Sequence, residues 1–218
     1  MTKTLEPPRF ARFELAYLLA GRTDAHAARS REIVGIPEVE SSDDLIYQAG
    51  LAGLVTRGLL EADGDGVMPR NEAGLAGLVL GTASQWISMA VRTPKLIDVS
   101  LLVQGVRGSV LIRQAPGGTF DLVFIKAGES IADVAVTLAE KMFADNAELA
   151  LMVRSADLET DAALFLQHSD ASGWQLGIDP VFPDDENWPA PDLVPTPSTQ
   201  QGVIDALREL VDRHRVAA

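Results

Sequence analysis

The stretch that decides the fold reads WISMAVR at residues 86–92, followed by IDVSLLVQ at 97–104, SVLIRQ at 109–114 and FDLVFIK at 120–126. Apolar and polar residues tend to alternate along these segments, which is the period of a half-buried β-strand. Short runs rich in Gly and Pro, typical of tight turns, separate several of the segments. The sequence therefore predicts an antiparallel β-meander over this stretch.

An amphipathic helix is predicted directly after the meander. Ser130 is a suitable N-cap, and Glu129 places an acid at the helix start. Apolar residues then recur at the spacing of one helix face: Ile131, Val134, Ala135, Leu138 and Met142. The meander and this helix make up a first sheet–helix unit, residues 86–143.

The same order of elements recurs nearer the C-terminus. LALMVR (149–154), AALFLQ (162–167) and WQLGID (174–179) are predicted to be strands, and a final helix ends in the basic segment 213–215. They form a second unit, residues 149–215, which includes a proline-rich loop over 180–198. Such a long loop is either functional or loosely ordered, and Trp188 within it is a candidate partner anchor or a side chain that fixes the loop to its own core.

The two units also match residue by residue, which favours an internal duplication. Val91–Thr93 matches Val153–Ser155, and Val110–Gln114 matches Ala163–Gln167. Neither unit has enough apolar surface for a core of its own, so we expect their sheets to combine with pseudo-two-fold symmetry. A chance resemblance between two antiparallel hairpins is the alternative.

Residues 1–85 are predicted to be mainly helical. Ser42–Asp44 is an N-cap with acids in the first turn, and Leu45, Ala49, Ala52 and Val55 follow as an apolar stripe that ends near Gly58. A tight turn is predicted over 63–66, and Asn71 and Glu72 are expected to cap a second helix. The predicted fold class is therefore α+β in a single domain, residues 1–218: a helical first part, then two β-meander-plus-helix units that form an antiparallel sheet with helices packed on it.

The charge of the chain is concentrated in one region. Its 218 residues contain 18 Lys and Arg and 31 Asp and Glu, a net charge of −13. Residues 128–200 hold 14 of the acids and two of the bases, a net charge of −12. This composition disfavours nucleic acid and anionic membranes as partners, and the acidic region is a solubilising face or an interface for a basic partner.

The motifs of common enzymes and metal sites do not occur in the sequence. There is no cysteine, no P-loop, no GxSxG and no HExxH, and the three histidines are far apart. The sequence therefore predicts no catalytic residue, no cofactor and no metal. The N-terminus lacks the pattern of a signal peptide and no apolar run is long enough to cross a bilayer, so we expect a cytoplasmic protein without membrane insertion.

Residues 44–125 resemble the EspG family of actinobacterial type VII (ESX) secretion-associated proteins. The resemblance rests on LAGLVTRGLLEADGDGVMPRNEAGLAGLVLGTAS (51–84), on the strands WISMAVR, SVLIRQ and FDLVFIK, and on the helix after them. It implies a pseudo-symmetric pair of sheet-and-helix units. It also implies a non-enzymatic cytosolic chaperone that binds a helical secreted client of PE/PPE type, or another type VII client, before export.

A chaperone of this kind needs an exposed apolar surface rimmed by polar residues. The candidate residues for it are those of two hairpins, one helix and the proline-rich loop: Pro116, Gly117, Gly118, Val134, Leu138, Met142, Ser169, Gly173 and Trp188. Two other functions stay open, an acidic binding protein such as an immunity protein for a basic toxin, and an enzyme with an unrecognised site. A homodimer stays open as well.

Overall fold

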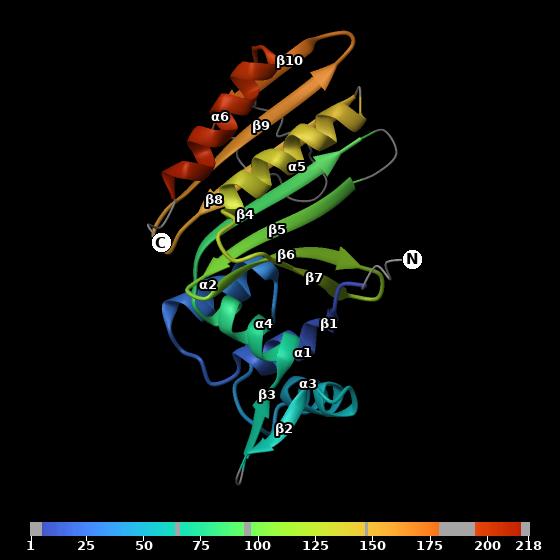
Figure 1. Ribbon diagram of the computed structural model, residues 1–218, viewed down its shortest axis with the longest axis vertical. Helices are drawn as coiled ribbons and strands as arrows, with labels where there is room; N and C mark the ends of the chain where they lie inside the picture. Colours follow the sequence, from blue (N-terminus) through green and yellow to red (C-terminus); the bar gives the residue numbers. More distant parts are fainter. Residues whose placement is uncertain (1–5, 64–65, 94–96, 147, 179–194, 215–218) are drawn as a thin grey trace. The chain divides into compact units, whose positions relative to one another are not determined.

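The computed structural model describes residues 6–63, 66–93, 97–146, 148–178 and 195–214 (Figure 1). The chain divides into two compact units. Unit 1 consists of Met1–Ser84 and Leu101–Ala127, and unit 2 consists of Gln85–Ser100 and Gly128–Ala218. No helix among the described residues is both long enough and apolar enough to cross a membrane.

The fold is α+β, as predicted, with six helices and a nine-stranded sheet in the described chain. The strand order is β1-β7-β6-β5-β4-β8-β9-β10-β11, and a separate hairpin pairs β2 with β3. The helices are α1 (Arg12–Leu19), α2 (Ala25–Val34), α3 (Leu45–Thr56), α4 (Asn71–Gly81), α5 (Ile131–Asp145) and α6 (Gln200–Arg213). The strands are β1 (Arg9–Ala11), β2 (Leu60–Asp63), β3 (Gly66–Pro69), β4 (Ala83–Arg92), β5 (Ile97–Gly105), β6 (Gly108–Ala115), β7 (Thr119–Ile125), β8 (Leu149–Ala156), β9 (Asp161–Ser169), β10 (Gly173–Ile178) and β11 (Thr196–Pro197).

The predicted strands are confirmed, but the residue matches between the two blocks need a correction. Val110–Gln114 lies in β6, which β5 separates from β4, whereas Ala163–Gln167 lies in β9, which pairs directly with β8. The match therefore joins strands at different positions in the sheet. An alternation of apolar residues is common to all half-buried strands, so similarity of pattern does not identify equivalent strands.

Unit 2 has one sheet face covered by α5 and α6, which run side by side over the strands (Figure 1). Six residues of α5 and five of α6 are buried. The side-chain amide of Gln85 at the start of β4 donates a hydrogen bond to the carbonyl of Val211 in α6, with Nε2 and O 2.7 Å apart. This bond is buried, so it ties the last helix to the sheet.

Unit 1 is built around α1, whose Leu15 and Leu19 are fully buried. Ser30 in α2 donates a hydrogen bond to the carbonyl of Leu80 in α4 over 2.6 Å. The ring of His26 in α2 is bonded through Nδ1 to the carbonyl of Ala83, also over 2.6 Å. These bonds join elements that are far apart in sequence.

The helix α3 contacts α1 through glycines. A Cβ atom added at Gly50 would overlap the carbonyl oxygen of Phe13 and lie 2.7 Å from Cβ of Tyr17. Beside them the buried carboxylate of Glu14 accepts a hydrogen bond from the Ala11 N–H over 2.8 Å and forms a 2.7 Å ion pair with Arg57, the residue that ends α3. Glycine is therefore required at position 50 for α3 to approach α1 closely.

The first part of the chain departs from its prediction in three places. The strand β1 and the β2–β3 hairpin were not expected, and Asn71 is the first residue of α4, with φ of 49°, rather than its N-cap. The helix α3 is confirmed, with Asp44 as its N-cap. However, its predicted apolar stripe is exposed, and the buried residues are Gly50 and Leu54.

Candidate interaction surfaces

One flank of α5 carries three of the predicted interaction residues. Val134, Leu138 and Met142 follow one another at four-residue spacing, and each is half-buried. Glu140 lies on roughly the opposite flank, where its carboxylate faces Arg208 of α6 at 3.4 Å. The three apolar side chains therefore lie on the flank of α5 that faces away from α6.

An aromatic cluster lies at the C-terminal end of α5. The ring of Phe143 meets the ring of Trp174 edge to face, with centroids 4.7 Å apart, and His168 lies 4.5 Å from the same ring. Trp174 is half-buried, which leaves part of the indole accessible. Sequence reasoning did not select Trp174 as a site residue, although a tryptophan at the start of a strand directly after a turn was a usable signal.

The hairpin between β9 and β10 is next to this cluster. Ser169 and Gly173 face each other across the two strands, and Gly173 has a φ of 66°. The Ser169 hydroxyl accepts the N–H of Ser172 over 3.1 Å and shares a 2.6 Å bond with the Ser172 hydroxyl. The structure thus brings Ser169 and Gly173 close to the C-terminal end of α5 through Trp174.

The other predicted residues lie elsewhere. Pro116, Gly117 and Gly118 form the exposed turn between β6 and β7 in unit 1, where both glycines have positive φ. The Thr119 hydroxyl donates to the Pro116 carbonyl over 2.9 Å and stabilises this turn. Trp188 lies outside the described residues.

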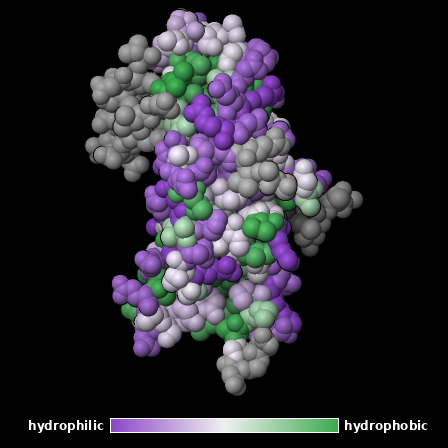
Figure 2. Space-filling model, turned by 90° about the vertical axis from the view of Figure 1, so that its left-hand side faces the viewer, coloured by the Kyte–Doolittle hydropathy of each residue, from purple (hydrophilic) through white to green (hydrophobic). Residues whose placement is uncertain are grey.

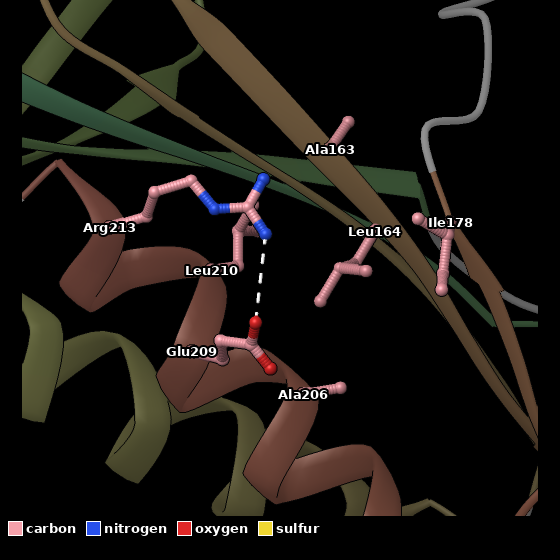
Figure 3. Close-up of a pocket in the computed structure, with 7 residues that line it drawn as sticks. All are labelled: Ala163, Leu164, Ile178, Ala206, Glu209, Leu210 and Arg213. Carbon is pink, nitrogen blue, oxygen red and sulfur yellow. Dashed lines mark ion pairs between the residues drawn. The ribbon is translucent and has the colours of Figure 1, made fainter.

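A small hollow lies in unit 2 between α6 and the strands β9 and β10 (Figure 3). Glu209 and Arg213 form an ion pair of 3.8 Å at its rim, and Ile178 is 69% exposed. In Figure 2, which shows the α6 side, hydrophobic atoms reach the surface in the upper part of the view with hydrophilic atoms around them. The volume of the hollow is about 100 Å³. This is smaller than the several hundred Å³ that small-molecule sites enclose. Its lining residues are Ala163, Leu164, Ile178, Ala206, Glu209, Leu210 and Arg213.

A serine, a histidine and an aspartate approach one another at the end of α6. His214 Nδ1 lies 3.0 Å from the Ser155 hydroxyl. Burial acts to raise the pKa of Asp157, but hydrogen bonds from Thr160 and Glu159 and the charge of His214 outweigh it and lower that pKa. Ser155 is fully buried, so a substrate has no access to its hydroxyl and the group serves to fix the end of α6. The described residues contain no group of three or more His, Asp or Glu that could hold a metal ion.

The acidic region of the sequence lies in unit 2. Its two basic residues both pair with carboxylates, Lys141 with Asp145 at 3.4 Å and Arg154 with Asp161. Several other acids among the described residues are exposed on helix and loop surfaces, among them Glu129, Glu148 and Glu159. The described part of unit 2 therefore presents a negatively charged surface.

Comparisons with known proteins found a likeness among solved structures. No family model matches the chain, and no curated protein matches it. Among solved structures, the chain is similar to the Mycobacterium tuberculosis type VII secretion system chaperone EspG5, in a structure of its complex with the PE25–PPE41 dimer. The TM-score is 0.43 at 12% sequence identity, and the match covers 85% of this chain and 92% of that one. A likeness at this level carries no argument about what this chain binds.

Proposed function

We propose that the protein is a non-enzymatic cytosolic chaperone or adaptor that binds a helical secreted client of PE/PPE type, or another type VII client, before export. The observation that carries this proposal is the half-buried apolar flank of α5, formed by Val134, Leu138 and Met142. The resemblance of residues 44–125 to the EspG family supports the choice of client class.

The spacing of the α5 flank suits a helical partner. Three apolar side chains four residues apart form a ridge about 12 Å long, and such ridges pack into the grooves of a second helix. Trp174 adds a large aromatic ring with a polar N–H, the type of side chain that dominates binding energy at interfaces. The α5 flank is therefore the proposed centre of the interface in unit 2, and Trp174, which packs against the buried Phe143, is a further proposed contact.

The β9–β10 hairpin is the proposed polar rim of this interface. Ser169 and Gly173 border Trp174, and the exposed turn Pro116–Gly118 is a separate proposed contact in unit 1. Trp188, in the proline-rich loop, stays a proposed anchor. We further propose that residues 1–218 act as one EspG-like domain that arose by duplication of a sheet–helix unit.

A binding assay with a charged substitution tests the proposal. Leu138→Asp places a carboxylate in the apolar ridge, and Thr137→Asp places the same charge at an exposed neighbour on the same helix. We expect Leu138→Asp to weaken binding of co-expressed PE–PPE pairs from the source organism about tenfold or more, which corresponds to about 1.4 kcal/mol. Thr137→Asp should leave binding unchanged. The proposal is wrong if the folded wild-type chain binds none of these pairs, or if the two variants bind equally well.

The acidic surface of unit 2 favours one second function, an acidic binding protein that neutralises a basic partner. The two candidates differ in their response to salt. An interface centred on the α5 flank should lose little affinity as ionic strength rises, whereas a complex formed through the exposed acids should weaken steeply. Titration of the captured partner at low and high salt separates them.

A further inference from the structure

The sheet of unit 2 has a second face, opposite to the one that α5 and α6 cover. Neighbouring residues of a strand point to opposite faces, and directly paired residues of two strands point to the same face. Ser155 of β8 is bonded to His214 at the end of α6, so Ser155 points to the covered face. The residues of β8 and β9 that point the other way form the second face: Ala150, Met152, Arg154, Ala156, Asp161, Ala163, Phe165 and Gln167.

Two large side chains at the centre of the second face are fully buried. Met152 and Phe165 lie directly opposite one another across β8 and β9, and neither is exposed. Ala156 and Ala163 on the same face are buried as well. An apolar strand residue that nothing covers keeps much of its accessible surface, as Val123 of β7 does at 41%. The second face is therefore covered.

The sequences of β8 and β9 also indicate burial on both faces. A strand with one solvated face alternates apolar and polar residues, whereas β8 contains the apolar run Leu149–Val153 and β9 the apolar run Ala162–Leu166. Besides the neighbouring strands, the described elements with substantial contacts to β8 and β9 are α5 and α6. Both helices lie on the same side of these strands (Figure 1). Among the described residues of unit 2, no further helix is left to cover the second face.

We infer that residues 179–194, within the proline-rich loop, pack across the second face of their own chain. This segment leaves β10 at Ile178 and returns to β11, where Thr196 pairs with Leu176 of β10. Both of its ends therefore lie at one edge of this sheet. An extended proline-rich segment of this length reaches about 50 Å, whereas a path over β9 and β8 and back is about 19 Å long.

The composition of the segment suits a cover rather than a further strand. Proline cannot donate to a sheet ladder, so a proline-rich segment does not extend the edge at β10 by strand pairing. The prolines are Pro180, Pro183, Pro189 and Pro191. The large apolar side chains, which can pack on Met152 and Phe165, are Val181, Phe182, Trp188, Leu193 and Val194. The other stretches of unit 2 outside the described residues, 94–96, 147 and 215–218, are too short to cross two strands.

The charges of the second face favour the same occupant. Arg92 of β4 pairs with Ala150 of β8, so it lies on the second face, and it is exposed. Arg154 lies on this face too and is half-buried. The segment 179–194 contains no basic residue and carries three consecutive acids, Asp184, Asp185 and Glu186. An acidic segment that crosses the second face is therefore attracted by two guanidinium groups.

This inference is independent of the proposed function. It concerns the sheet face opposite to α5, so the Leu138→Asp variant should keep the second face covered. A part of the segment is enough to cover Met152 and Phe165, so Trp188 stays available as the proposed anchor for a client.

Methionine oxidation by hydrogen peroxide tests the cover in the folded chain. The variant replaces residues 181–193 with a Gly/Ser segment of the same length. Met89 of β4 is the matched control, because it is buried and points to the covered face, where it pairs with Val153. The exposed Met68 gives the rate of an accessible methionine. We expect Met152 to oxidise about tenfold faster or more in the variant than in the wild type, with Met89 unchanged. A variant in which Met152 stays as protected as Met89 overturns the inference.

Photo-cross-linking tests the cover with the segment intact. A photoreactive p-benzoylphenylalanine replaces Gln167, which is half-buried on the second face, and in a control chain it replaces the exposed Thr137 of α5. Digestion and mass spectrometry then identify the attached peptide. We expect position 167 to cross-link to residues 179–194 of the same chain, and position 137 not to do so. Cross-links from position 167 to another part of the chain, or to a second copy, overturn the inference.

Discussion

The helices α3 and α5 are both rich in apolar residues, yet they use them differently. Six residues of α5 are buried, and its remaining apolar side chains form a half-buried flank. Only two residues of α3 are buried, and its apolar side chains lie on both the inner and the outer face. An amphipathic helix attaches through large side chains, whereas an apolar helix with glycines attaches by close backbone approach and leaves large side chains free for another partner.

The largest expected effect on the free energy of unfolding comes from removing a large buried side chain of α5 in unit 2. Phe143→Ala removes a buried ring that contacts Trp174 and should lower the free energy of unfolding by about 4 kcal/mol. All three tryptophans belong to unit 2, so tryptophan emission during urea unfolding reports on it. The control Met142→Ala, on the half-buried flank, should cost much less. Equal losses for the two variants would show that the buried face does not anchor α5.

The corresponding change in unit 1 adds atoms instead of removing them. Gly50→Val introduces side-chain atoms where the α1 backbone lies, so it should destabilise unit 1 by about 3 kcal/mol even though valine suits a helix better than glycine. Both tyrosines lie in unit 1, so their near-UV circular dichroism follows its unfolding. Ala52→Val on the exposed face is the control and should stay within about 0.5 kcal/mol of wild type. If Gly50→Val leaves the stability of unit 1 unchanged, α3 is not held to α1 by close backbone contact.

The smallest expected effect is a dependence of the stability on pH, which arises at the contact between α1 and α3. Burial, with help from Tyr47, raises the pKa of Tyr17 to about 12. The folded state therefore holds this proton more tightly than the unfolded state, in which the pKa is about 10. Its contribution to stability is complete below about pH 10 and is lost as pH rises through the folded pKa. Urea unfolding at a series of alkaline pH values should show this decline, and Tyr17→Phe should reduce its slope. An unchanged slope in the variant would place Tyr17 in a solvent-like environment.

The sequence predicts helices and strands well where apolar residues recur with a regular period on one face of the element. The meander strands and α5 have a clear period, and Ser130 caps α5 as expected, accepting the N–H of Ala132 over 3.2 Å. The strand β1 has only three residues, and its ion pair between Arg9 and Asp121 joins positions 112 residues apart. No local pattern can predict such a contact.

The face of α3 could not be predicted from periodicity, because apolar residues surround the whole helix. The face was determined by Gly50, and glycine in a helix is ordinarily taken as a weak point rather than as a contact. Of the candidate site, the β9–β10 hairpin lies near the C-terminal end of α5, because Trp174 packs against Phe143, which is not one of the candidate residues. Their role in binding stays a prediction.

The hydrogen bond between Gln85 and Val211 also has a consequence for synthesis of the chain. Unit 1 is complete once residue 127 has been made, whereas unit 2 contains residues 85–100 and extends through the C-terminal helix. Gln85 in β4 is therefore synthesised more than a hundred residues before the helix to which it is bonded. We therefore expect unit 1 to fold while the ribosome makes the remainder of the chain, and Gln85 to gain its hydrogen-bond partner only after α6 has been made.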